Sequence, residues 1–249
     1  MVTLLHAELR KLLGLRTAWI GLAMGLVAPP ALVLLNAGPN RAAIADGSYG
    51  DVSDLAFHSL MIAVLGVMTL GVVTVSSEYT PTGEEGGRQI TTTLAAMPRR
   101  RPLLVAKGAA LALVAAVQGA VTTATTLVLV TVKYGDAIPT PEPARAVGAV
   151  FYLVLTALLA YAITLIFRNG VVTLTLLIVN SGVVSLSYLL TKVTPVAAYL
   201  PDIVGPYMFL RSIGAGDIQI PPVRAGLVMT AWVAALLVLA AWRFDRREA

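Results

Sequence analysis

The stretch AVGAVFYLVLTALLAYAITLIF, residues 146–167, decides the fold of this chain. It contains no charged side chain over its 22 residues, and a helix needs about 20 apolar residues to cross the hydrocarbon core of a bilayer. Polar and apolar residues do not alternate along it, as they would in a strand of an outer-membrane barrel. The stretch therefore predicts a membrane-spanning helix.

Five further uncharged windows of comparable length lie on either side of this stretch. The six predicted spans cover residues 17–36, 57–77, 107–132, 146–167, 170–190 and 224–242. Of the 249 residues, 57% are hydrophobic and 12% are charged, whereas soluble domains average about 25% charged residues. A soluble fold of this size cannot hide six apolar helices from water. We therefore expect one all-α transmembrane domain over residues 1–249.

Basic residues are distributed unequally between the segments that connect these spans. With the N-terminus in the cytoplasm, 12 of the 18 lysines and arginines fall on the cytoplasmic side. This excess predicts both termini in the cytoplasm and a multi-pass location in the cell inner (cytoplasmic) membrane. The net charge of +5 flanks the spans and does not line one soluble face, so membrane lipid is an expected partner and nucleic acid is not.

Three segments outside the spans have patterns of their own. Residues 1–16 place several leucines near one helical face, which predicts a helix lying in the membrane interface. Residues 36–54 contain glycines and aspartates and are expected to form an external connector. The apolar stretch 199–210 is too short to span the membrane and too apolar for a solvated loop, so we expect it to dip into the membrane or cover the bundle.

The sequence excludes several kinds of chemistry. It contains no cysteine and no G-x-x-x-x-G-K-[ST] phosphate loop, so the chain lacks the usual ATPase motif and no cofactor is expected in it. The spans carry no ionisable group away from their ends, which disfavours ordinary proton-driven or sodium-driven transport. The run Glu84-Glu85-Gly86-Gly87-Arg88 resembles the glutamate pair of intramembrane CAAX-type proteases. That family sets its arginine one residue further on and places the motif on a membrane helix with histidines that activate water, whereas this pair lies in a predicted loop.

The predicted cytoplasmic segment 78–106 is longer than a simple connection requires. Thr82 and Glu85 have the spacing of a capping box, which predicts a short helix that extends to Ala96. Glu84 and Arg88 fall near the start of this helix. The acidic residues at its start are not needed to fix the topology, so we expect them to contact a partner protein.

Short motifs in this segment resemble the ABC-2 type transporter permeases. They are SEY at 77–79, RQITTTL at 88–94 and MPRRRPLLVAK at 97–107, and LHAELRK at 5–11 resembles the N-terminal start of that family. The resemblance implies a type V exporter: an interfacial elbow helix, six spans, a cytoplasmic coupling helix and an external re-entrant segment. It also implies two permease copies, or a copy and a paralogue, paired with a separate ABC ATPase subunit that binds ATP.

The resemblance assigns expected roles to particular residues. Contacts with the ATPase subunit are expected from Glu84, Glu85, Arg88 and Arg99. Spans two and five are expected to line the substrate path, where the polar residues are Thr69, Thr74, Asn180, Ser181 and Ser185. A buried amide such as Asn180 also serves as a hydrogen-bonding contact between helices, which is the simpler interpretation of its presence.

The function expected from these observations is a non-enzymatic permease subunit of an ATP-driven exporter. The resemblance suggests a hydrophobic drug, an antimicrobial peptide or a lipid-like molecule as the substrate. The alternatives are an ion-coupled secondary transporter or channel, and an intramembrane enzyme. A neighbouring ATPase gene would distinguish the exporter from both.

Overall fold

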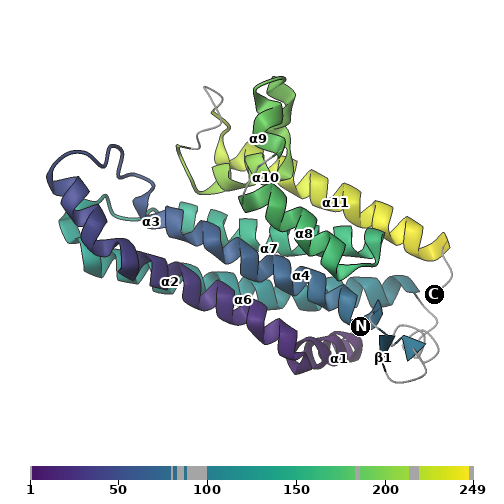
Figure 1. Ribbon diagram of the computed structural model, residues 1–249. Helices are drawn as coiled ribbons and strands as arrows, with labels where there is room; N and C mark the ends of the chain where they lie inside the picture. The colour runs from purple at the N-terminus through teal and green to yellow at the C-terminus, as the bar shows by residue number, and fades with distance from the viewer. Residues whose placement is uncertain are drawn as a thin grey trace.

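The computed structural model describes residues 2–79, 81–82, 87–88, 100–182, 186–212 and 219–246. These residues form an elongated bundle of helices (Figure 1). Its long helices are α2 (Arg16–Ala45), α4 (Ala63–Tyr79), α6 (Arg100–Tyr134), α7 (Pro143–Phe167) and α11 (Pro222–Arg246). Its shorter helices are α1 (Val2–Gly14), α3 (Leu55–His58), η1 (Ser59–Ile62), η2 (Gly135–Ala137), α8 (Gly170–Gly182), α9 (Leu186–Thr191), η3 (Pro195–Tyr199), α10 (Pro201–Val204) and η4 (Gly205–Met208).

Five helical stretches are long and apolar enough to cross a membrane. They are α2, the continuous run α3–η1–α4, α6 with η2, α7 and α11. The chain is therefore an all-α, multi-pass membrane protein, as the sequence predicts. The most apolar of them is α7, which contains the stretch 146–167 and packs against α4, α6 and α11 in the middle of the bundle.

The predicted span over 170–190 is not confirmed as a single helix. In this region α8 has 13 residues, a length of about 20 Å at 1.5 Å per residue, which is less than the roughly 30 Å hydrocarbon core. Residues 183–185, which follow α8, lie outside the described residues. Figure 1 shows α9 standing away from the bundle at a steep angle to α8.

Glycines allow α2 and α4 to cross closely. A Cβ atom added to Gly66 of α4 would lie 2.6 Å from the carbonyl oxygen of Gly21 and 2.6 Å from the amide nitrogen of Gly25 on α2. Only glycine fits between two backbones at this separation, and small residues of this kind drive helix association in membranes.

Two helices are longer than the spans predicted from the sequence. With 30 and 35 residues, α2 and α6 are about 45 and 52 Å long. The helix α2 continues through Pro29, Pro30 and Pro39 to Ala45, so the first part of the expected connector 36–54 is helical. At this end the Asn40 amide donates a hydrogen bond to the Tyr134 hydroxyl of α6 over 3.2 Å, which satisfies polar groups on both helices.

The helix predicted to start at Thr82 is wrong at its first turn. Residues Pro81–Thr82 form β1 and pair antiparallel with β2, Gly87–Arg88, with Thr82 opposite Gly87. Glycine is unfavourable in a helix and threonine favours extended backbone, so the sequence Gly86-Gly87 opposes the helix that the capping pattern predicts. The remainder of the predicted coupling helix, including Glu84 and Glu85, lies outside the described residues, and so does Arg99.

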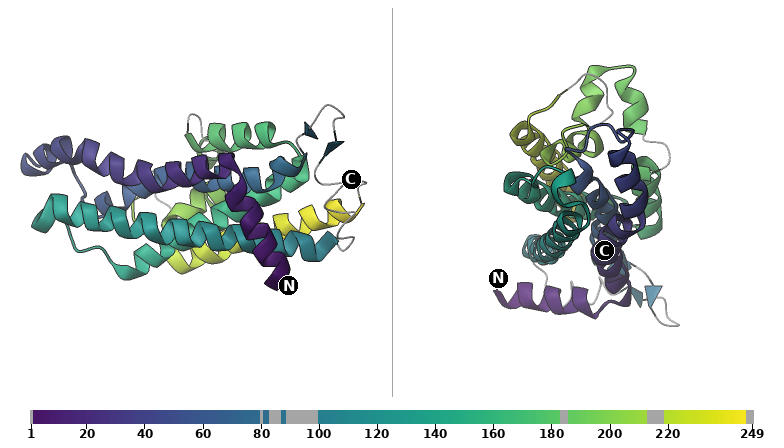
Figure 2. Two further views of the ribbon diagram at one scale, coloured as in Figure 1. Left: turned by 90° about the horizontal axis from the view of Figure 1, so that it is seen from below. Right: turned by 90° about the vertical axis from the view of Figure 1, so that its left-hand side faces the viewer.

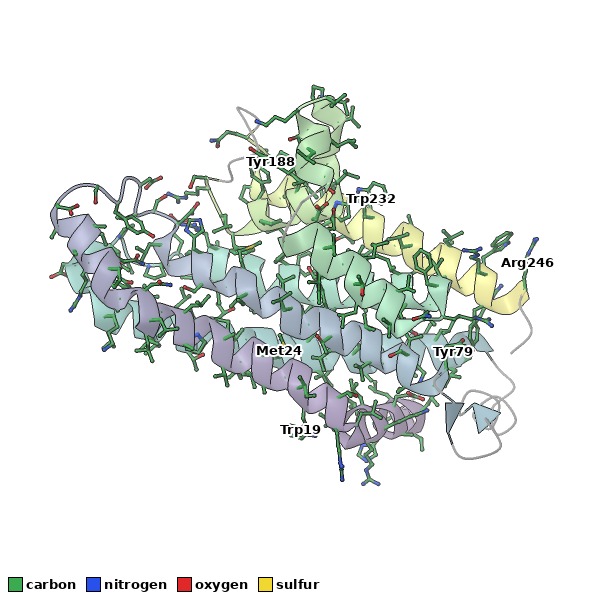
Figure 3. The ribbon with its side chains drawn as sticks, viewed as in Figure 1. Trp19, Met24, Tyr79, Tyr188, Trp232 and Arg246 are labelled. Atoms are coloured by element: carbon green, nitrogen blue, oxygen red, sulfur yellow. The ribbon has the colours of Figure 1, made fainter. Side chains whose placement is uncertain are left out.

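Both termini and the β1–β2 pair lie at one end of the bundle (Figure 1). At this end α1 crosses beneath the long helices at a large angle, as the two views of Figure 2 show. Two exposed tryptophans lie toward this end of their helices: Trp19 of α2 is 58% exposed, and Trp242 of α11 is 51% exposed beneath the Arg246 guanidinium. Figure 3 shows Trp19 pointing away from the bundle. Exposed aromatic residues at this level are typical of a membrane interface.

The apolar stretch 199–210 covers the bundle, in agreement with the sequence. It folds into the end of η3, then α10 and η4, and packs against α7 and α11. The side chains of Val204, Tyr207 and Phe209 are almost completely buried. Gly148 of α7 makes this contact possible, because an added Cβ atom there would lie 2.3 Å from the carbonyl oxygen of Met208.

Candidate functional site

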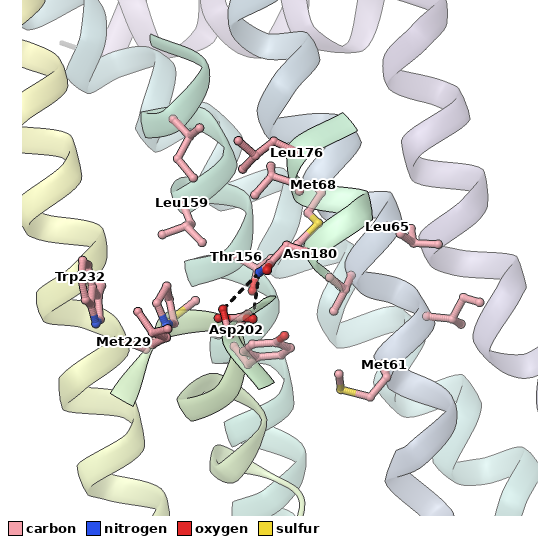
Figure 4. A pocket seen from close by; sticks show the side chains of 18 of the residues that line it. Met61, Leu65, Met68, Thr156, Leu159, Leu176, Asn180, Asp202, Met229 and Trp232 are labelled. Carbon is pink, nitrogen blue, oxygen red and sulfur yellow. Dashed lines mark hydrogen bonds between the residues drawn. The ribbon is translucent and has the colours of Figure 1, made fainter. Parts of the chain in front are cut away.

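A cavity of about 660 Å³ opens inside the bundle, within the range of roughly 300–1,000 Å³ typical of small-molecule sites. Its walls come from α4, α7, α8 and α11, and Pro201 and Asp202 of α10 also line it. The lining side chains are mostly leucine, isoleucine, methionine and tryptophan. Figure 4 shows Met61 and Met68 on one wall and Met229 and Trp232 on the opposite wall. The polar side chains that line it are His58, Tyr152, Thr156, Asn180, Ser187 and Asp202.

Asn180 and Asp202 form the polar end of this cavity. The Asn180 side-chain nitrogen donates a hydrogen bond to Asp202 Oδ2 over 2.9 Å and has a longer contact of 3.5 Å with the Ser187 hydroxyl. Figure 4 shows the two side chains facing each other. Asp202 follows Pro201 in the first turn of α10, and this short helix brings the carboxylate back from the connecting segment into the bundle. A carboxylate thus lines a chamber whose walls are mostly apolar.

A second group of polar side chains is buried at the end that carries both termini. Lys107 of α6 is 3% exposed, Glu8 of α1 is 7% exposed and Glu78 of α4 is 2% exposed. The Lys107 ammonium lies 2.7 Å from Glu8 Oε2 and 2.8 Å from Glu78 Oε1, and Lys11 of α1 also pairs with Glu78. Two acids and two bases therefore balance each other. We call these four residues the basal ionic cluster.

The basal ionic cluster joins α1 to α4 and α6, the two helices that lie on either side of residues 80–99 in the sequence. Glu78 lies at the end of α4, just before the residues that lead to β1, and Lys107 lies in the second turn of α6. Glu8 and Lys11 belong to α1. Removing one partner from a buried ion pair costs about 3–5 kcal/mol, because a charge is left without compensation. The cluster therefore ties α1 firmly to both helices that enclose residues 80–99.

A third polar centre lies at the opposite end of the bundle, around Asp54. Its side chain is fully buried and accepts hydrogen bonds from the backbone N–H groups of Arg211 and Ser212, at 2.8 and 2.7 Å, and from the Arg145 guanidinium. Burial opposes its ionisation, but the Ser212 and Arg211 N–H groups, the Ser212 hydroxyl and Arg145 outweigh this effect, so the pKa of Asp54 lies below its ordinary value.

Arg145 connects this centre to two further segments. Its Nε donates to the carbonyl oxygen of Phe209 over 2.7 Å and its Nη1 donates to the carbonyl oxygen of Ser53 over 2.9 Å. The guanidinium also lies 4.2 Å from the centre of the Phe57 ring, at a distance where a cation is attracted by the ring face. Asp54 and Arg145 therefore fix the segment after η4 to the start of α3. Their contacts indicate a structural role.

The residues predicted to line a substrate path are only partly brought together. Asn180 lines the cavity, but Thr69 and Thr74 do not. Their hydroxyls donate to the carbonyl oxygens of Leu65 and Leu70, one turn earlier in the same helix, at 2.7 Å each. These bonds satisfy the two threonines within α4.

The other predicted site residues fall where little is described. Ser181 belongs to α8, but its side chain lies outside the described residues, and so does the whole of Ser185. Arg88 lies in β2, and its side chain is likewise not described.

The sequence did not predict the two features that carry the most charge into the bundle. Asp202 lies outside every predicted span, so the rule that spans lack ionisable groups did not detect it. The signal that could have found it is a carboxylate within the apolar stretch 199–210. The sequence places three residues of the basal ionic cluster, Glu8, Glu78 and Lys107, in an interfacial helix or at the border of a loop. Each nevertheless belongs to a mainly apolar helical segment, which allows its side chain to be buried.

Among the residues that the structure describes, no three histidine, aspartate or glutamate side chains are arranged to hold a metal ion. Comparisons of the chain with family models, with curated proteins and with solved structures found no match. The chain's own residues, and the resemblance of its motifs to the ABC-2 type permeases, are therefore the basis for inferring its function.

Proposed function

We propose that this chain is the membrane-spanning permease subunit of an ATP-driven exporter, energised by a separate cytoplasmic ATPase subunit and acting as a pair of permeases. The observation that carries the proposal is the basal ionic cluster. It joins the N-terminal helix to the two helices that enclose residues 80–99, the segment whose motifs resemble the permease family. A partner protein that binds this segment therefore acts on a region where buried ion pairs hold three helices together.

The placement of the connecting segments supports the same function. The termini and the β1–β2 pair lie at one end of the bundle, while α10 and η4 cover α7 and α11 elsewhere. A subunit that receives work at one end needs contacts that carry the displacement to the cavity. The run from Leu55 to Tyr79 does this, because Glu78 at its end belongs to the basal ionic cluster and Met61 and Met68 line the cavity.

The first test is association with an ATPase. The permease is co-expressed with an ATPase subunit encoded nearby, and each is purified through a tag on the other. We expect the two to co-purify, the chain alone to hydrolyse no ATP, and the reconstituted pair to move substrate only with ATP. Reversing the charges of Glu84, Glu85 and Arg88 together should reduce both association and transport.

The matched control reverses Asp46 and Asp51, which are exposed in the connector between α2 and α3 and bond only to nearby serines among the described contacts. Association should be unaffected by this change. Asp54 is left out of the control because it is buried in a structural centre. Equal loss in both variants would indicate misfolding, and full transport by the triple variant would exclude the 84–88 segment as the coupling element.

A second candidate function is ion-coupled secondary transport. The observation that favours it is Asp202, because a carboxylate inside a membrane bundle is the type of group that carries protons in such transporters. One experiment, on vesicles that contain the chain alone, distinguishes the two functions. Substrate movement driven by an imposed proton gradient, without any ATPase, would establish the second candidate and refute the first.

A further inference from the structure

We propose that the contact between α2 and α6 binds internal water beside the Pro29–Pro30 turn of α2, and that Gln118, Thr122 and Thr126 of α6 hold this water. None of these residues lines the cavity described above, and the site does not depend on the proposed transport function. Its ligand is water, bound by neutral oxygen atoms from both helices.

The first observation is a row of three buried polar side chains on α6. Gln118, Thr122 and Thr126 are spaced four residues apart, so they follow one another along one side of the helix. Each is at most 2% exposed. Gln118 Oε1 and the two threonine hydroxyl oxygens have no hydrogen-bond partner within the described part of the chain. Buried polar groups are nearly always paired in folded proteins, so these three atoms need a further group.

Other threonines of α6 satisfy their hydroxyl groups in a different way. Thr125 and Thr131 each donate to a carbonyl oxygen one turn earlier in the same helix, at 2.8 and 2.9 Å. Thr122 and Thr126 do not make this local bond. Their hydroxyls are therefore left for a group that lies between the helices.

The register between α2 and α6 is fixed by a contact at each end of this row. The Gln118 amide donates to the carbonyl oxygen of Gly21 over 3.1 Å, and the Asn40 amide donates to the Tyr134 hydroxyl over 3.2 Å. The two helices therefore run in the same direction and lie side by side over about four turns, as Figure 1 shows. Residues at equal separations from these contacts lie at matching heights.

The Pro29–Pro30 turn lies at about the height of Thr126, two turns beyond the contact between Gln118 and Gly21. Proline has no backbone N–H, so the carbonyl groups four residues earlier, those of Gly25 and residue 26, receive no α-helical hydrogen bond from this turn. Both Gly25 and Pro29 are buried. Two helices thus bring groups that lack partners to the same part of the bundle.

Water matches the chemistry of this set of groups. The released carbonyls and Gln118 Oε1 accept hydrogen bonds, and the two threonine hydroxyls both donate and accept. A buried water molecule makes about three hydrogen bonds, to acceptors and donors alike. Ordered water also satisfies the carbonyls that proline releases in membrane helices, so α2 can bend at this turn without leaving these groups unpaired.

The direct test is water-edited solid-state NMR of the unaltered chain, with isotope-labelled threonine, in lipid bilayers. Thr164 is the internal control, because it is also fully buried but donates to the carbonyl oxygen of Ala160 within α7 over 2.6 Å. We expect Thr122 and Thr126 to receive magnetisation from water several times faster than Thr164. Equal transfer rates at the three threonines would overturn the proposal.

Replacing the buried threonines by valine gives a second test, in which the sign of the effect decides. Removing a hydroxyl that has no partner stabilises a protein, whereas removing one that holds a bound water molecule destabilises it. We expect Thr122→Val and Thr126→Val each to lower the midpoint of thermal unfolding by about 2–4 °C. Thr125→Val is the matched control, because its hydroxyl is exposed, and its midpoint should change little. A midpoint that is unchanged or raised in the two buried variants would overturn the proposal.

Pro29→Ala tests the part played by α2. Alanine restores an N–H group that can donate to the Gly25 carbonyl, so this carbonyl no longer needs water. Transfer of magnetisation from water to Thr122 and Thr126 should become slower, while transfer to Thr164 stays the same. Unchanged transfer to all three threonines would mean that α2 does not hold the water, and would overturn the assignment of the site to the contact between α2 and α6.

Discussion

Replacing Lys107 by methionine tests the basal ionic cluster directly. Methionine keeps most of the length of the side chain and removes its charge. Glu8 then loses its 2.7 Å ion pair inside the bundle, while Glu78 keeps its pair with Lys11. The other three members of the cluster, Glu8, Lys11 and Glu78, are at least partly buried. Removing one member of a buried ion pair costs about 3–5 kcal/mol. We expect a loss of unfolding free energy in that range.

The double variant Glu8→Leu/Lys107→Met makes the argument sharper. It removes one acid and one base together, and the Lys11–Glu78 pair stays balanced. Replacing a buried ion pair by apolar side chains is often neutral or stabilising. The double variant should therefore be more stable than Lys107→Met, although it carries one more substitution.

Unfolding is measured in mixed micelles by titration with a denaturing detergent and followed by circular dichroism. Glu142→Gln is the control, because Glu142 pairs with Arg211 through side chains that are about half exposed, and such pairs contribute about 0–1 kcal/mol. Two results would contradict this prediction: a loss of unfolding free energy in Lys107→Met no larger than in the control, or a double variant less stable than Lys107→Met. Either would mean that the cluster does not hold the three helices together and does not couple them to a partner.

Three further predictions concern Asp54, the helix crossing and the topology. The pKa of Asp54 is lowered in the folded protein, so its contribution to stability is complete above the ordinary carboxylate range and is lost as the pH falls through the folded value; thermal unfolding from pH 7 to pH 3 should show this loss, and the difference between Asp54→Asn and the parent should shrink toward acid pH. Gly66→Val should destabilise the bundle by about 1–3 kcal/mol through overpacking, whereas Gly38→Ala, where an added Cβ atom meets nothing within 4 Å, should not destabilise it; equal unfolding free energies would refute the close crossing of α2 and α4. A cysteine at position 46 should react with an impermeant maleimide from outside intact cells while tags at both termini stay protected, and the opposite labelling pattern would reverse the topology.

Hydropathy was sufficient to predict the class of fold. The stretch 146–167 lies in the apolar helix α7, and the windows at 17–36, 57–77, 107–132 and 224–242 each fall inside a long helix. The window 170–190 is not confirmed as one span. Within it α8 covers Gly170–Gly182 and α9 covers Leu186–Thr191, and each is too short to cross a bilayer by itself.

The candidate site was harder to predict because burial depends on partners from other parts of the chain. Asn180 was identified because an amide is conspicuous within an apolar window. Its partner Asp202 comes from a segment 22 residues later, and no local pattern connects the two. The same holds for Lys107 and Glu8, which are 99 residues apart. The capping pattern at Thr82 and Glu85 failed because it competed with two adjacent glycines.

The three polar centres are related through the continuous helical run from Leu55 to Tyr79. Asp54 fixes its start to the segment after η4, and Glu78 fixes its end to α1 and α6. Between them, Met61 and Met68 face the cavity. A packed helix held at both ends moves as a unit, so a displacement imposed on Glu78 changes the cavity wall and strains the contacts of Asp54 at the other end. We therefore expect binding at the cavity and work done at the end that carries the termini to be coupled through this helical run, as the proposed permease with a separate ATPase requires.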